Sequence, residues 1–234
     1  MKKNKIFISI ASYRDPELIP TIENCIENAD NPKNLVFGIS RQYHPDESFD
    51  DLKKYKKKKN FRIIETLYNK SVGVCHARHQ IQGLYQDEEY YFQLDSHHRF
   101  IKGWDTKLKS TLKELSDSGS EKPLLTAYLP SYDPDKKDED RLNDVWRMYI
   151  DRFMPEGPIF IFPESIQDFK SKSPEKARFT SGHFIFTLGK FCKEVPYDPK
   201  LYFHGEESSL GARAYTWGYD LYHLHRPWVW HHYT

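Results

Sequence analysis

The sequence predicts an α/β fold built around a mostly parallel sheet. Two short apolar runs, residues 6–11 and 35–40, have the composition of buried central strands. Between them, Asp15 can cap a helix whose first position is Pro16, and the apolar positions that follow recur with helical spacing. This β-loop-α-β opening is typical of a parallel sheet that binds a nucleotide.

Later segments continue the alternation of strands and helices. Helical spacing of apolar residues predicts a helix from residue 71, a second after Trp104-Asp105, and a third from Glu206 that ends at Gly218. Polar stretches at 131–141 and 165–176 read as disordered loops or active-site lids. Further strands are expected at 61–67, 90–94, 123–129, 158–162, 183–187 and close to the C-terminus.

The length of the chain favours one domain, and its net charge argues against a general affinity for nucleic acid. A chain of 234 residues can form a single large domain, which we place at 1–234. With 35 basic and 34 acidic residues, the net charge of +1 creates no field that would recruit nucleic acid. Aromatic residues make up 15% of the chain, which leans weakly towards a sugar or base ligand because rings stack on both.

The cysteines and the N-terminus predict a cytoplasmic protein. Three widely spaced cysteines without a C-x-x-C pair indicate neither a disulfide framework nor a zinc site. The apolar run behind the basic start is too short for a signal peptide, and no window approaches the about 18 apolar residues of a membrane span.

The strand at 90–94 ends in a candidate metal site. Asp95 and His97 stand two apart in an extended segment, so both side chains can face one cation. An Asp oxygen with a His nitrogen suits Mn²⁺ or a similar ion better than Ca²⁺. The plain alternative is a surface turn, since a lone D-x-H is a weak signal. An imidazole from the His-rich end of the chain could supply a third ligand.

Phosphate groups would have to be held without a glycine-rich loop. The sequence contains neither G-x-G-x-x-G after the first strand nor G-x-x-x-x-G-K-[ST], which argues against dinucleotide dehydrogenases and P-loop ATPases. A metal ion can neutralise a diphosphate instead. Arg78, near the start of a predicted helix, is a candidate donor contact or else a surface ion-pair partner.

Glu206 and Glu207 open the last predicted helix. Acidic residues in a first helical turn commonly complement the helix dipole, and that is the plain reading. As part of a site they would bind hydroxyl groups of a donor or an acceptor.

Taken together, these motifs resemble a known family in order and along nearly the whole chain. The sequence is similar to the GlcNAc-transferases typified by the polypeptide N-acetylglucosaminyltransferase that modifies hydroxyproline on Skp1, and more distantly to the polypeptide GalNAc-transferases, which share a D-x-H motif and a late His ligand. The matching segments are residues 8–15, 73–78, 92–100, 103–105, 195–199, 205–207 and 231–233.

The resemblance implies a GT-A fold, an α/β/α sandwich with a nucleotide-binding half at 1–105 and an acceptor-binding half at 106–234. It implies a UDP-sugar donor, with UDP-GlcNAc the first choice, a Mn²⁺ or Mg²⁺ ion, transfer with retention, and a protein or glycan hydroxyl as acceptor. Because family members carry longer C-terminal regions, the domain is expected to be truncated at Thr234.

Carried over by position, the resemblance assigns a role to each candidate residue. Asp95, His97 and His231, or else His232, become metal ligands. Glu206 and Glu207 flank the sugar or acceptor as catalytic candidates, and Glu206 is the first to test as nucleophile or base. Donor contacts are expected from Ala11, Ser12 and Arg14 around the uridine and from Arg78, Asp95, Ser96 and Gly182 elsewhere.

Two other functions remain open from the residues. A single-metal hydrolase could use Asp95, His97 and His231 with a water molecule. A carbohydrate-binding module with a structural ion is the non-enzymatic alternative, although it leaves the nucleotide-type opening unexplained.

Overall fold

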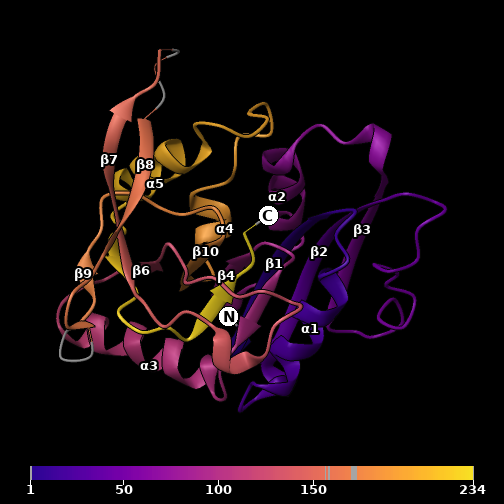
Figure 1. Cartoon of the computed structure of the whole chain (residues 1–234), viewed down its shortest axis with the longest axis horizontal. Coiled ribbons are helices and arrows are strands. Elements are labelled where there is room, and N and C mark those ends of the chain that lie inside the picture. The colour runs from indigo at the N-terminus through magenta and orange to yellow at the C-terminus, as the bar shows by residue number, and fades with distance from the viewer. Residues whose placement is uncertain (1, 156, 158, 170–172, 234) are drawn as a thin grey trace.

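The computed structural model describes residues 2–155, 157, 159–169 and 173–233, and its centre is one eight-stranded sheet. The strand order is β3-β2-β1-β4-β10-β6-β11-β9 (Figure 1). The strands are β1 (Lys2–Tyr13), β2 (Leu35–Tyr43), β3 (Phe61–Leu67), β4 (Glu88–Leu94), β6 (Pro123–Thr126), β9 (Glu175–Lys176), β10 (Phe184–Leu188) and β11 (Asp220–His223).

The sheet is mostly parallel, as predicted. Strands β3, β2, β1 and β4 run parallel, and β11 runs parallel to β6. β10 is antiparallel to both of its neighbours, and so is β9 to β11. The carboxyl ends of β1, β2 and β4 therefore meet at one edge, which is where ligands collect in such sheets.

Helices cover both faces of the sheet, so the molecule is an α/β/α sandwich (Figure 1). Successive strand residues point to opposite faces: Ile6 and Ile8 pack with α1 and α3, while Phe7 packs with α2, α4 and α5. The helices are α1 (Leu18–Glu27), α2 (Val74–Gln82), α3 (Trp104–Asp117), α4 (Phe191–Glu194) and α5 (Glu206–Thr216), with 3₁₀ turns η1 (Pro32–Asn34), η2 (Tyr68–Lys70) and η3 (Asp138–Asp140).

Two small ladders complete the fold. β5 (His98–Phe100) pairs antiparallel with β12 (Val229–His231), which sets His231 opposite His98. β7 (Trp146–Phe153) and β8 (Ile159–Ser165) form a hairpin that projects from the body (Figure 1). The first ladder brings the C-terminal segment to the loop that follows β4.

Several predicted boundaries were wrong. The first helix begins at Leu18, not Pro16, because Asp15 Oδ1 accepts the Glu17 backbone N–H at 2.8 Å and closes a turn first. The strand expected to reach residue 129 ends at Thr126. β5, β7 and β11 were missed, since each is short or half exposed and lacks a clear apolar run.

Several other expectations agree with the structure. β3 has the predicted bounds, and all three cysteines are free and buried. The predicted polar stretch 131–141 contains only the turn η3 as a helix, and β9 lies within 165–176. Residue 158 and residues 170–172 of the predicted segments lie outside the described residues. Within the described part of the chain, no helix has the length and apolar character needed to cross a bilayer.

Candidate active site

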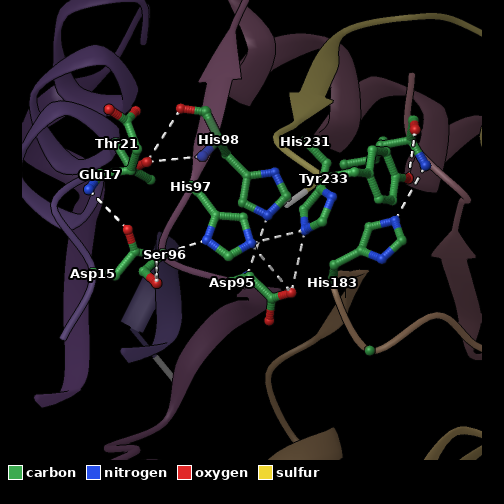
Figure 2. A network of polar contacts seen from close by, with 12 residues as sticks. Asp15, Glu17, Thr21, Asp95, Ser96, His97, His98, His183, His231 and Tyr233 are labelled. Carbon is green, nitrogen blue, oxygen red and sulfur yellow. Dashed lines mark hydrogen bonds and ion pairs between the residues drawn. The ribbon is translucent and has the colours of Figure 1, made fainter. Parts of the chain in front are cut away.

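Three side chains converge at the carboxyl edge of the sheet. His231 Nε2 lies 3.1 Å from His97 Nε2 and 3.3 Å from Asp95 Oδ2, and His97 Nε2 lies 4.0 Å from the same oxygen. Figure 2 shows all three pointing towards one another, Asp95 and His97 from the loop after β4 and His231 from β12. One carboxylate and two imidazoles thus face a common point, with their ligand atoms within 4.8 Å of one another.

The ring of His97 is oriented by Asp15. Asp15 Oδ2 lies 2.6 Å from His97 Nδ1 and also accepts the Ser96 hydroxyl (Figure 2). Because the carboxylate occupies Nδ1, Nε2 is the nitrogen that faces His231 and Asp95. Carboxylate partners of this kind commonly fix the tautomer of a metal-binding histidine.

His98 holds the backbone of the site in place. His98 is fully buried, and burial lowers the pKa of its ring well below the ordinary value, which keeps it neutral. Its Nδ1 lies 2.9 Å from the Trp230 carbonyl and its Nε2 accepts the Asp95 backbone N–H at 3.2 Å. His98 therefore ties β12 to the loop that carries Asp95.

Arg78 links the candidate ligands to α5. Its guanidinium, 2% exposed, donates to Asp95 Oδ1 at 2.6 Å and to Glu206 Oε1 at 3.1 Å, and it contacts the Tyr197 hydroxyl at 3.1 Å. Burial by itself raises the pKa of Asp95, but the charge of Arg78, together with His231 and His97, outweighs it and holds that pKa well below its usual range. Asp95 is therefore an anion in this site.

The two glutamates of α5 lie in different surroundings. Glu206 is buried and both its oxygens are engaged, since Oε2 also accepts from the Cys75 thiol at 2.9 Å. Glu207 accepts one bond, from the Gly182 backbone N–H to Oε1 at 2.6 Å. Burial raises the pKa of Glu207 to about 7.

The donor set suits a divalent ion. At metal–ligand distances of about 2.1 Å, ligands at right angles lie about 3.0 Å apart and opposite ligands about 4.2 Å apart, and the three observed separations fall in this range. The nearby carboxylates also favour positive charge at this point. Burial by itself lowers the pKa of the His97 ring, but Asp15 and Asp95 outweigh it and raise that pKa. One carboxylate and two imidazoles could hold a divalent ion that accepts both oxygen and nitrogen ligands.

A pocket of about 450 Å³ adjoins the end of β1. Its walls come from β1, β2, η2, the start of α2 and the loop at 202–203, and they include Ala11 and Ser12. The Ser12 hydroxyl is buried without a hydrogen-bond partner among the described residues. This hydroxyl is therefore free to bond a water molecule or a ligand in the pocket.

The structure separates some predicted site residues from the rest. Arg14 does not line the pocket; it pairs with Glu47 and lies over the Tyr68 ring, 5.3 Å from the ring centre. His232 Nδ1 lies 3.3 Å from the Tyr132 carbonyl and outside the ligand cluster, so His231 is the histidine that meets Asp95. Gly182 packs against Arg78 and Glu206, where a Cβ would come within 2.8 Å of both.

Sequence reasoning missed three residues of the site. Asp15 was read only as a helix cap, although its place directly after β1 at the sheet edge is a usable signal. Tyr197 contacts Arg78, and its hydroxyl accepts from Gln93 at 2.7 Å. His183 stacks on the His231 ring at 4.4 Å (Figure 2). Both are far from Asp95 and His97 in sequence. Tyr197 lies in the segment 195–199 that resembles the family, but no role was assigned to it, and no local pattern marks His183.

Comparison with solved structures identifies the fold class as GT-A. The structure of GalNAc-T7 with UDP, GalNAc and Mn²⁺ superposes with a TM-score of 0.69 at 16% identity, covering 98% of this chain and 44% of that one. TarS 1–349 of S. aureus in complex with UDP-GlcNAc gives 0.63 at 12% identity, covering 98% and 59%. This chain thus spans about half the length of these structures. No curated protein matches the sequence.

The sequence also matches a family model, described as Glycosyltransferase (GlcNAc), over residues 5–56 and 47–234. The chain belongs to this glycosyltransferase family.

Proposed function

We propose that this chain is a metal-dependent glycosyltransferase that moves GlcNAc from UDP-GlcNAc to a protein or glycan hydroxyl with retention. One observation carries the proposal: Asp95, His97 and His231 converge at the edge of the sheet where the 450 Å³ pocket opens. Family membership supports sugar transfer, and the fold neighbours were solved with UDP, Mn²⁺ and UDP-GlcNAc. TarS and the family description favour GlcNAc as the sugar.

Both halves of the chain would contribute to the nucleotide site. Residues 1–105 supply most of the pocket that we assign to the nucleotide, but Tyr202 and Phe203 from the other half close it. Tyr13 and Tyr68 offer rings for the base, and the N-terminus of α2 favours phosphate. Ser12 supplies the unpartnered hydroxyl.

Asp95, His97 and His231 would hold Mn²⁺ or Mg²⁺, which when bound supplies Lewis-acid stabilisation of the charge on the departing diphosphate. Arg78 acts through Asp95, because its guanidinium is buried against Asp95 and Glu206. Asp15 holds the His97 ring in place. Ser96 contributes through the same carboxylate rather than by facing the donor.

The contacts of the three carboxylates argue against a covalent intermediate between sugar and enzyme. Arg78 donates to both Asp95 and Glu206, and the Cys75 thiol donates to Glu206. Glu207 accepts from the Gly182 backbone N–H, and its pKa is raised to about 7. None of the three is a free anionic nucleophile. We therefore propose that the acceptor hydroxyl attacks the anomeric carbon on the face that the UDP leaves. The bond between sugar and diphosphate breaks, the hydroxyl proton passes to the departing diphosphate oxygen, and Glu207 positions the sugar.

The decisive experiment is calorimetric titration of UDP with and without Mn²⁺. We expect binding that depends on Mn²⁺, lost in His231→Asn and Asp95→Asn and kept in His232→Asn, with circular dichroism showing folded variants. Metal-independent UDP binding, or loss in His232→Asn alone, would contradict the assignment. A single-metal hydrolase would instead cleave phosphoester or amide probes without binding UDP.

A further inference from the structure

We propose that a second pocket, next to the metal ligands on the side of β7 and β8, binds a neutral saccharide as the acceptor. This inference rests on the proposed transferase function and names its acceptor class. The pocket has a volume of about 580 Å³, and its lining comes entirely from residues 128–233. It is separate from the nucleotide pocket, with which it shares no lining residue.

Aromatic rings form one wall of this acceptor pocket. Tyr128 stacks on Tyr233 at 5.5 Å with 10° between the ring planes, and its ring lies 6.2 Å from that of Trp146. Tyr132 adds a fourth ring. Flat rings beside polar groups suit a pyranose, whose C–H faces pack on them while its hydroxyls remain free to hydrogen-bond.

Charged side chains elsewhere in the lining can form hydrogen bonds with sugar hydroxyls. Asp133 and Asp140 contribute carboxylates, and Lys136 pairs with Asp133 at 3.3 Å. Two acids and one base leave the lining with an excess of one negative charge, from −2 and +1. This excess disfavours phosphorylated or uronic acid sugars and favours neutral ones.

The aromatic wall reaches the metal ligands. The Tyr233 ring lies 4.3 Å from the His231 ring (Figure 2), and Tyr233 also stacks on Tyr128. The Tyr132 backbone N–H donates to the His231 carbonyl at 3.1 Å. A sugar on this wall would therefore lie beside the place where the bond between the donor sugar and its diphosphate would break.

The backbone around the pocket is poorly suited to an extended peptide. Leu142 N–H donates to the Ser131 carbonyl at 3.2 Å, and the Leu142 carbonyl accepts Trp230 Nε1 at 2.7 Å. Ser131 itself bridges to His231. The Ser131 carbonyl and both backbone groups of Leu142 are thus already paired and are not available to a peptide strand, whereas the side chains of the lining can contact a saccharide.

Saturation-transfer NMR on the whole chain tests the proposal without donor or metal. The probes are methyl glycosides of glucose, galactose, mannose and GlcNAc, against glucuronic acid, glucose 6-phosphate and a peptide containing serine and hydroxyproline. We expect saturable binding of at least one neutral glycoside. Trp146→Ala should weaken it by about tenfold or more, Trp146→Phe should restore part of it, and Phe153→Ala, an exposed hairpin control, should leave it unchanged.

Three results would overturn the proposal: no binding of any neutral glycoside at millimolar concentration, binding that ignores Trp146, or Trp146-dependent binding of the peptide or an anionic sugar instead. Because the measurement needs no nucleotide, a chain that fails to bind UDP still gives a readable answer. The proposed donor chemistry and the proposed acceptor class can therefore fail separately.

Discussion

Glu206 and Glu207 are neighbours in the sequence, but their carboxylates differ in what holds them. The oxygens of Glu206 are used by Arg78 and Cys75, so this residue maintains the charge balance around a buried guanidinium. Glu207 is held through one oxygen, and burial raises its pKa to about 7. Glu207, rather than Glu206, is therefore the better candidate to contact a substrate.

Substitution of Glu207 separates a positioning role from a nucleophilic one. We expect Glu207→Gln to lower kcat by no more than about tenfold, because an amide still accepts from Gly182 and can donate to a sugar oxygen. Glu207→Ala should lower it by about a hundredfold. The assay is release of UDP, with the anomer of the product read by NMR.

A loss of a thousandfold or more in Glu207→Gln would mean that the carboxylate attacks the sugar itself. Glu206→Gln is the matched control. Since it weakens the buried partner of Arg78, we expect lower stability to urea rather than a specific loss of kcat.

Glu88 makes the fold sensitive to acid. Burial by itself raises the pKa of this carboxyl, but Arg62, at 2.5 Å, and the Gln86 backbone N–H outweigh it and lower the pKa to about 2. Because the folded pKa lies below the unfolded one, the stabilisation is complete above about pH 4.5 and is lost as the pH falls towards 2.

The pH dependence is testable with one substitution. Wild type should lose about 3 kcal/mol of unfolding free energy from this group between pH 5 and pH 2. Glu88→Gln should be less stable at pH 7 and show a shallower decline, measured by urea unfolding across this range. Exposed Glu121→Gln is the control, and an equal decline in all three proteins would refute the assignment.

At the scale of elements, the start of α2 depends on Gly73. This residue has a φ of +105°, and a Cβ there would lie 2.5 Å from the Tyr202 carbonyl oxygen. The turn thus lets the loop at 202–203 close against the nucleotide pocket. A side chain would strain the backbone and push that loop away.

We expect Gly73→Ala to destabilise the protein by about 2 kcal/mol and to weaken UDP binding in Mn²⁺ by about tenfold. Gly218→Ala is the matched control: its φ is +80°, but a Cβ meets nothing within 4 Å. It should show the backbone cost without the loss of UDP affinity. Equal UDP affinities in wild type and Gly73→Ala would mean that Tyr202 does not contribute to UDP binding.

At the scale of the whole molecule, the candidate metal site joins distant parts of the chain. Asp95 and His97 follow β4, while His231 belongs to β12, whose only described strand partner is β5. A bound ion would therefore stabilise the folded state in which these segments meet.

Mn²⁺ at about a hundred times its Kd should stabilise the fold by about 3 kcal/mol, a rise in Tm of roughly 5–10 °C for a chain of this size. A chelator should reverse the rise, and His231→Asn should abolish it, while the same concentration of Ca²⁺ should do much less. The measurement is a thermal melt followed by tyrosine and tryptophan fluorescence. An undiminished rise in His231→Asn would place the ion elsewhere.

The sequence alone determined the class of fold and the local half of the site. Apolar periodicity marked the strands and the main helices, since that pattern reflects which face of each element is buried. Asp95 and His97 could be paired because residues two apart in an extended segment share a face. Ala11 and Ser12 were expected near a uridine only from the family resemblance, and both line the pocket at the end of β1.

Only the tertiary structure decided which distant side chains meet. The β5–β12 register selects His231 over His232, and ion pairing with Glu47 takes Arg14 out of the pocket. Contacts between α5 and α2 occupy both oxygens of Glu206, whereas among the described residues only one oxygen of Glu207 accepts a hydrogen bond. These outcomes depend on contacts between residues up to 136 positions apart, for which a pattern confined to neighbouring residues carries no information.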